Sequence, residues 1–131
     1  MSKIILDSKR VNRKEKGKEL ERRTRQFAVQ IIELSSKLPN TEAGRVVKYQ
    51  MVKAETSIGA NYREANRSVS KADFRNKIGI CMKEASETEY WLEVAIEADM
   101  LLWAHVKSIY EECKELLAIF TSSYYTSKKA T

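Results

Sequence analysis

Apolar residues recur at alternating intervals of three and four along four stretches of this chain, the spacing that aligns side chains on one face of an α-helix. The four stretches cover residues 20–38, 47–65, 74–96 and 106–124. The sequence shows no long strand-like alternation and no glycine-rich loop opening a helix after a strand. Four amphipathic helices with short connections predict an all-α fold, an antiparallel up-and-down four-helix bundle.

Local signals mark two of the connections. Pro39 disfavours helical geometry at the residue before it and lacks a backbone N–H, so it ends the first stretch. Asn40 and Thr41 follow it and offer side-chain oxygens that cap a new helix. Ser70 and Asp73 form a second capping pair, in which the acid favours the positive end of the helix.

Composition limits the chemistry open to the chain. Cys81 and Cys113 have no Cys-x-x-Cys spacing, so we expect reduced, buried thiols. His105 is the one histidine, which leaves no His-rich metal site. No apolar run reaches the ~18–20 residues of a spanning helix, and the first residues lack the features of a secretory signal. We therefore expect a cytoplasmic protein that is not an enzyme, with no metal, cofactor or membrane contact.

The positive charge is concentrated at the beginning of the chain. Residues 1–26 contain ten Lys or Arg and four Asp or Glu, whereas residues 27–131 contain fourteen of each. This asymmetry predicts a polyanionic partner, and phosphate contacts would give salt-dependent, sequence-independent affinity for nucleic acid. No aromatic residue is interleaved with the cations of the arm, so base stacking is not indicated there. The candidate nucleic-acid-binding residues are Lys9, Arg10, Arg13, Lys14, Lys16, Lys18, Arg22, Arg23 and Arg25.

The charge pattern also divides the chain. We expect a basic N-terminal arm over residues 1–18, a four-helix bundle over residues 19–125 and a polar tail over residues 126–131. The arm would become ordered on binding, whereas the arginines that follow it would be held by the first helix. A membrane surface, an acidic protein and a merely solvated basic face are the alternatives to nucleic acid.

A second stripe runs beside the core stripe of the second and third helices. Its small, polar and aromatic members are Gln50, Ala54, Ser57, Asn61, Glu64, Glu84, Glu87, Trp91, Val94, Ala98 and Leu101. A monomeric bundle buries about one stripe per helix, so a second stripe predicts a homo-oligomer. Asn61 either fixes register at such an interface or bonds to a nearby carbonyl. For Glu64, Glu84 and Glu87 we expect ion pairs with Lys or Arg rather than catalysis.

Two segments carry a family resemblance. They are Thr56 to Ala65 and Lys83 to Leu92, supported by Arg23, Thr24, Phe27, Ala28, Leu38, Pro39, Gln50, Asp73, Phe74 and Lys77. Over about residues 19–125 the chain resembles the four-helix bundle proteins encoded in intervening sequences of bacterial 23S ribosomal RNA genes. The resemblance implies a homopentamer with no known enzymatic activity. It also implies packing or interface roles for Asn61, Glu64, Asp73, Glu84, Glu87, Tyr90 and Trp91.

Two functions of different classes follow. The first is a homo-oligomeric ring that binds ribosomal RNA or other nucleic acid through phosphates. A more distant similarity to pentameric accessory proteins of diversity-generating retroelements favours this function. The alternative is a protein-interaction scaffold, in which the second stripe recruits another protein. An enzyme that uses Glu84 and Glu87 is a third class, which metal in the purified protein would support.

Overall fold

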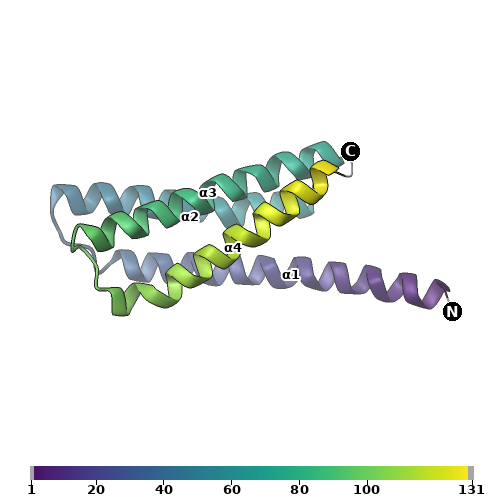
Figure 1. Cartoon of the computed structure of the whole chain (residues 1–131), viewed down its shortest axis with the longest axis horizontal. Coiled ribbons are helices and arrows are strands. Elements are labelled where there is room, and N and C mark those ends of the chain that lie inside the picture. Colours follow the sequence, from purple (N-terminus) through teal and green to yellow (C-terminus); the bar gives the residue numbers. More distant parts are fainter. Residues whose placement is uncertain (1, 130–131) are drawn as a thin grey trace.

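The computed structural model describes the backbone of residues 2–129 and the side chains of residues 13–129. All regular secondary structure in this range is helical: α1 (Ser2–Ser35), α2 (Glu42–Asn66), α3 (Lys71–Glu97) and α4 (Trp103–Lys129). Each helix packs against the next one along the chain, and α4 returns to α1 (Figure 1). The predicted all-α fold of four helices is confirmed.

The two predicted helix caps are present. The Thr41 hydroxyl accepts a hydrogen bond from the Gly44 backbone N–H at 3.0 Å, and the Ser70 hydroxyl accepts one from the Asp73 N–H at 3.0 Å. Gly44 is required in the first of these turns, because a Cβ atom there would lie 2.0 Å from the Pro39 carbonyl oxygen. The turn after α1 therefore depends on a residue without a side chain.

The end of α3 has a cap that carries no glycine. Asp99 adopts a left-handed conformation with φ of 57°. Its N–H donates to the Ile96 carbonyl at 3.0 Å, and the Met100 N–H donates to the Ala95 carbonyl at 2.8 Å. This pair of bonds is the Schellman arrangement, in which glycine is the usual left-handed residue and Asp is one of the few tolerated substitutes.

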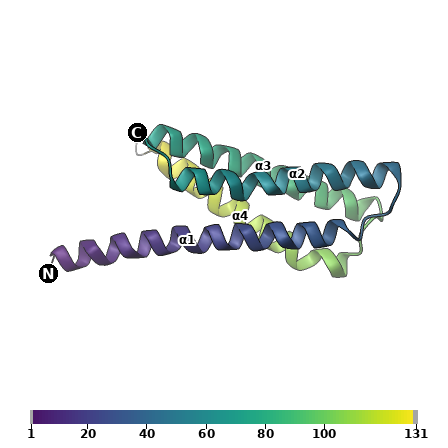
Figure 2. The ribbon, with the colours of Figure 1, turned by 180° about the vertical axis from the view of Figure 1, so that it is seen from behind.

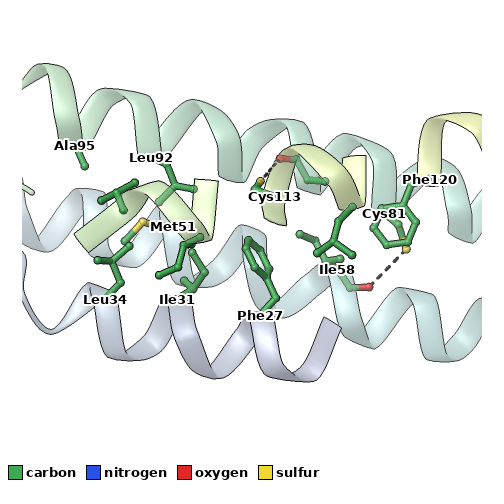
Figure 3. Close-up of a cluster of buried hydrophobic side chains, with 14 of the residues drawn as sticks. Phe27, Ile31, Leu34, Met51, Ile58, Cys81, Leu92, Ala95, Cys113 and Phe120 are labelled. Atoms are coloured by element: carbon green, nitrogen blue, oxygen red, sulfur yellow. Dashed lines mark hydrogen bonds between the residues drawn. The ribbon is translucent and has the colours of Figure 1, made fainter. Parts of the chain in front are cut away.

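The core contains one apolar stripe from each helix, as Figure 3 shows for its central part. The predicted stretches of the first three helices supply most of the core, although Leu20, Asn61 and Phe74 in them are only partly buried. On α4 the sequence pattern predicts a row through Val106, Tyr110, Cys113, Leu117, Phe120 and Tyr124, and this prediction was partly wrong. Ile109 and Leu116 are buried there, and Tyr110 and Leu117 are only half-buried. Both rows fit a helical period, so the sequence pattern alone does not choose between them.

Both cysteines are buried and free, as predicted. The Cys81 thiol donates to the Ile58 carbonyl at 3.5 Å and the Cys113 thiol to the Ala85 carbonyl at 3.4 Å (Figure 3). Burial raises the pKa of each thiol to about 12. These groups therefore stay protonated and unreactive at neutral pH.

Helix α1 is longer than the sequence pattern indicates. The helix continues through residues 2–18, the segment expected to be an arm that orders on binding, and it extends past the end of the bundle (Figure 2). Residues 126–129, expected to be part of a polar tail, form the last turn of α4. Lys, Arg and Glu are good helix formers, so a helix continues beyond the point where its apolar stripe ends.

Glu55 is a buried acid in the middle of α2. Its side chain is 0% exposed, and neither carboxylate oxygen has a hydrogen-bond partner among the described residues. Burial raises the pKa of Glu55 to about 8. The carboxylate in turn contributes to the raised pKa of the Cys113 thiol on α4. Glu55 is therefore mostly protonated at neutral pH, inside the bundle.

Glu55 predicts an unusual pH dependence of stability. Folded protein keeps the Glu55 proton up to about pH 8, whereas the unfolded chain loses it near the ordinary pKa of 4.5. Stability therefore falls as pH rises between these values, by up to about 1.4 kcal/mol per pH unit. The free energy of unfolding, measured in urea across this pH window, should fall with pH in the unmodified protein. In Glu55→Gln and Glu55→Leu the part of this pH dependence that Glu55 causes should be absent. The same slope in all three proteins contradicts this assignment.

Candidate functional site

One end of the bundle gathers cations from three elements. The N-terminal part of α1, the α2–α3 connection and the C-terminal end of α4 all lie at this end, where α1 diverges from the C-terminal end of α4 (Figure 1). The Asn66 side-chain amide donates to the Gly17 carbonyl at 3.5 Å, and Ser127 lines a hollow with residues of the α2–α3 connection. We call this surface the basic end. Its exposed cations are Arg13, Lys14, Lys16, Lys18, Arg67, Lys71 and Lys129.

The cations of the basic end are not neutralised by ion pairs. Among the residues whose side chains are described, no carboxylate lies within 4.0 Å of any of these seven groups. Of the carboxylates nearby, Glu21 contacts Arg63 at 3.6 Å and Glu64 contacts Lys77 at 2.9 Å, whereas Glu15 is exposed among the α1 cations without an ion pair within 4.0 Å. The surface therefore presents positive charge that is free to meet an anion.

Three cations of this surface are not apparent from the sequence. Arg67, Lys71 and Lys129 belong to the part of the chain whose charge sums to zero, so a count along the sequence gives no sign of them. The fold carries them to the end where α1 projects. The one available signal is that in an up-and-down bundle the second connection and the C-terminus lie at the same end as the N-terminus.

Arg23, a predicted phosphate contact, holds two helices together. Its guanidinium donates to both carboxylate oxygens of Glu112 on α4, at 3.1 and 2.6 Å, and contacts Glu115 at 3.1 Å. The side chain is 24% exposed. The hydrogen bond to Glu112 is the main reason why the pKa of Arg23 is raised. The guanidinium is thus already occupied by carboxylates.

The remaining predicted cations lie in three settings. Arg22 is exposed and pairs with Glu19 on its own helix. Arg25 is exposed and lines a shallow hollow on α1 with Gln26 and Val29. Lys9 and Arg10 belong to α1, but their side chains lie outside the described residues. Of the nine predicted cations, the structure brings Arg13, Lys14, Lys16 and Lys18 to the basic end.

The second stripe is only half-buried in a single chain. Asn61 donates to the Ser57 carbonyl at 2.7 Å, which is the local alternative anticipated for it. The predicted ion pairing is confirmed for Glu64 through Lys77, whereas Glu84 and Glu87 have no Lys or Arg within 4.0 Å among the described residues. The stripe's Ala54 and Leu101 are buried in the core instead, whereas Gln50, Ser57, Asn61, Glu84, Glu87, Trp91 and Val94 are partly exposed.

The middle of this stripe holds groups that one chain leaves unsatisfied. Burial, and then the neighbouring Glu87, raise the pKa of Glu84. The Trp91 indole N–H is buried and has no hydrogen-bond partner among the described residues. The ring of Tyr90 stands edge-on to Trp91, with centroids 5.1 Å apart, and remains exposed. Asp73 lies apart from these residues, in the first turn of α3.

Metal sites and membrane spans are both absent from the part of the chain that the structure describes. These residues contain no group of three or more His, Cys, Asp or Glu side chains able to hold a metal ion. None of the helices within residues 2–129 combines the length and apolarity needed to cross a bilayer.

Comparison with known proteins identifies the class. Residues 18–122 match the family model of the 23S rRNA-intervening sequence protein. A crystal structure from Bacteroides thetaiotaomicron, described as a protein with unknown function from the S23 ribosomal protein family, is 38% identical, with a TM-score of 0.74. The similarity covers 79% of this chain and 96% of that chain. No curated protein matches the chain. The chain belongs to the 23S rRNA-intervening sequence protein family, and the predicted family is confirmed.

The arginine contacts predict that neighbouring residues differ in their effect on stability. Arg23→Ala removes the link between α1 and α4 and should lower the free energy of unfolding by about 1 kcal/mol. Arg23→Lys keeps the charge but not the bidentate hydrogen bonding. Its loss in free energy of unfolding should therefore lie between zero and the loss in Arg23→Ala. Arg22→Ala is the matched control and should leave Tm unchanged, because its ion pair is exposed. Equal losses from Arg22→Ala and Arg23→Ala in urea unfolding contradict the assignment.

Proposed function

We propose that this protein is a non-enzymatic, homo-oligomeric helix bundle that binds structured RNA through phosphate contacts at the basic end. The observation that carries the proposal is the gathering of exposed cations from α1, the α2–α3 connection and α4 without carboxylate partners. Phosphate contacts of this kind supply most non-specific affinity for nucleic acid.

The helical form of α1 strengthens this proposal. A helix rises about 1.5 Å per residue, so Arg13 to Lys18 project cations within about 8 Å along the helix axis. A cation on a formed helix loses less conformational entropy on binding than one on a disordered arm. The Asn66 contacts to Gly17 and Glu21 fix the end of α2 beside this segment.

The family description suggests which RNA to test first. Its description connects these proteins with 23S ribosomal RNA, and neither that description nor that of the Bacteroides thetaiotaomicron structure names a catalytic activity. Ribosomal RNA is a dense array of phosphates, which suits cations that read charge rather than base sequence. Ribosomal RNA is therefore the first partner to test.

We also propose that the second stripe joins copies of the chain into a ring, with five subunits by family resemblance. The half-buried Glu84, Glu87 and Trp91, and the unpartnered indole N–H above all, support an interface there. A buried donor without an acceptor is costly, and a neighbouring chain would supply the acceptor. A ring would also repeat the basic end around one axis.

The assembly predicts a definite mass. Light scattering of nuclease-treated protein should give about five times the chain mass of 15.1 kDa. Trp91→Ala should lower this mass because it removes the largest side chain of the stripe, while circular dichroism stays helical. Tyr125→Ala, an exposed aromatic on α4, serves as the control. A single-chain mass for the unmodified protein contradicts the ring.

The RNA proposal predicts that loss of lysines at the basic end changes the salt dependence of RNA affinity more than loss of the same number of lysines elsewhere. Lys14→Gln with Lys18→Gln should reduce the slope of log affinity against log salt by roughly 0.7–0.9 for each phosphate that the protein no longer binds. The matched control is Lys37→Gln with Lys107→Gln, exposed lysines at the opposite end with the same charge change. Titration of labelled ribosomal RNA fragments measures both pairs. Equal slopes for the two pairs contradict the proposal, and a protein partner that survives nuclease treatment would favour the scaffold alternative.

A further inference from the structure

The first half of α2 carries an outer face that the bundle does not cover. Val46 is 53% exposed and Tyr49 is 62% exposed, whereas the core residues Val47 and Met51 of the same turns are buried. A shallow hollow of about 480 Å³ lies over this face. We call it the α2 outer face, lined by Arg45, Lys48, Tyr49, Val52 and Lys53.

Cations surround the exposed ring. The Lys53 ammonium lies over one face of the Tyr49 ring, 5.7 Å from the ring centroid, so a base would stack on the opposite face or displace the ammonium. Arg45 and Lys53 are eight positions apart, about 12 Å along the helix axis, with Tyr49 midway between them. A cation therefore stands on each side of an exposed aromatic ring. This arrangement is absent from the basic residues of α1, among which no aromatic residue lies.

Acidic residues leave this positive charge largely intact. No carboxylate of the described residues lies within 4.0 Å of Arg45, Lys48 or Lys53. Arg45 donates a hydrogen bond to the neutral Asn40 side chain at 3.3 Å. Two acids stand nearby. Glu42 lies in the preceding turn, and Glu84 lies on α3, where burial raises its pKa and the charge of Lys53 offsets part of that rise.

The α2 outer face is separate from the basic end. It lies close to the α1–α2 connection, whereas the basic end lies at the α2–α3 connection (Figure 2). Gly59, later in α2, already packs beside Thr24 of α1. Helix α1 runs alongside from one surface to the other. Its residues 18, at the basic end, and 35, at the α1–α2 connection, are about 25 Å apart along the helix axis.

We propose that the α2 outer face binds a single-stranded segment of nucleic acid, with an unpaired base stacked on Tyr49 and flanking phosphates bound by Arg45, Lys48 and Lys53. Single-strand-binding surfaces combine a positive groove with aromatic rings on which bases stack. The valines beside Tyr49 extend the apolar floor under such a base. This site goes beyond the phosphate contacts of the basic end, because it selects unpaired over paired strands.

Other occupants fit these residues less well. An acidic peptide would neutralise the cations but leave the Tyr49 ring without a flat partner. The proposed ring joins copies through the second stripe, which lies on a different face of α2, and a further two-fold contact through this face would bring Arg45, Lys48 and Lys53 against their own equivalents, where like charges repel. A nucleotide offers both a flat apolar base and an anionic phosphate.

The test uses full-length protein and two labelled probes, a short oligouridylate and an RNA duplex of equal length. Tyr49→Ala should weaken oligouridylate binding about tenfold, because it removes the stacking ring. Tyr49→Phe should retain the affinity. Tyr125→Ala, with an aromatic of similar exposure on α4, is the control and should bind both probes like the unmodified protein. Duplex binding should not change in Tyr49→Ala.

Each other outcome overturns the proposal. Unchanged oligouridylate affinity in Tyr49→Ala shows that the ring does not stack a base, and equal losses in Tyr49→Ala and Tyr125→Ala show an unspecific effect. A lower oligomer mass in Tyr49→Ala assigns the face to a contact between copies. The lysine pair of the basic end separates the two proposals. If Lys14→Gln with Lys18→Gln leaves duplex binding intact, the basic-end proposal fails while the Tyr49 result stands.

Discussion

Burial of one apolar stripe from each helix determines where every other feature of the molecule lies. The stripe of α1 begins at Leu20, which is partly buried against the core, and continues through the buried Phe27 and Ile31. Before Leu20, α1 runs on past the bundle and meets the rest of the chain through polar contacts such as that of Gly17 with Asn66. The end of the core thus leaves a projecting helix, whose exposed side chains are largely cations.

Helical geometry then sorts neighbouring residues into different roles. Arg23 faces α4 and binds Glu112, whereas Arg22, one position earlier, faces solvent. On α2, Glu55 points into the core while Tyr49 points away from it. Adjacent positions on a helix are about 100° apart, so charge measured along the sequence does not equal charge presented on a surface.

The sequence predicted what depends on local pattern. The number of helices, the caps at Thr41 and Ser70 and the burial of both cysteines all follow from spacing and residue type. The sequence did not predict the helix cap at Asp99, because glycine is the usual signal for a left-handed residue there. It also did not predict that Glu55 is buried without a hydrogen-bond partner among the described residues, because Glu55 lies beside the apolar stripe of α2 and not in it. The full set of cations at the basic end was not predicted, because the fold brings them together from distant segments of the chain.

The most direct test of the account is the salt dependence of affinity between the unmodified, nuclease-treated protein and a structured ribosomal RNA fragment. Phosphate binding predicts that log affinity falls linearly with log salt, by roughly 0.7–0.9 for each phosphate contacted, so that several contacts give a steep line. A flat line, or no binding at low salt, would contradict the claim that the basic end binds nucleic acid.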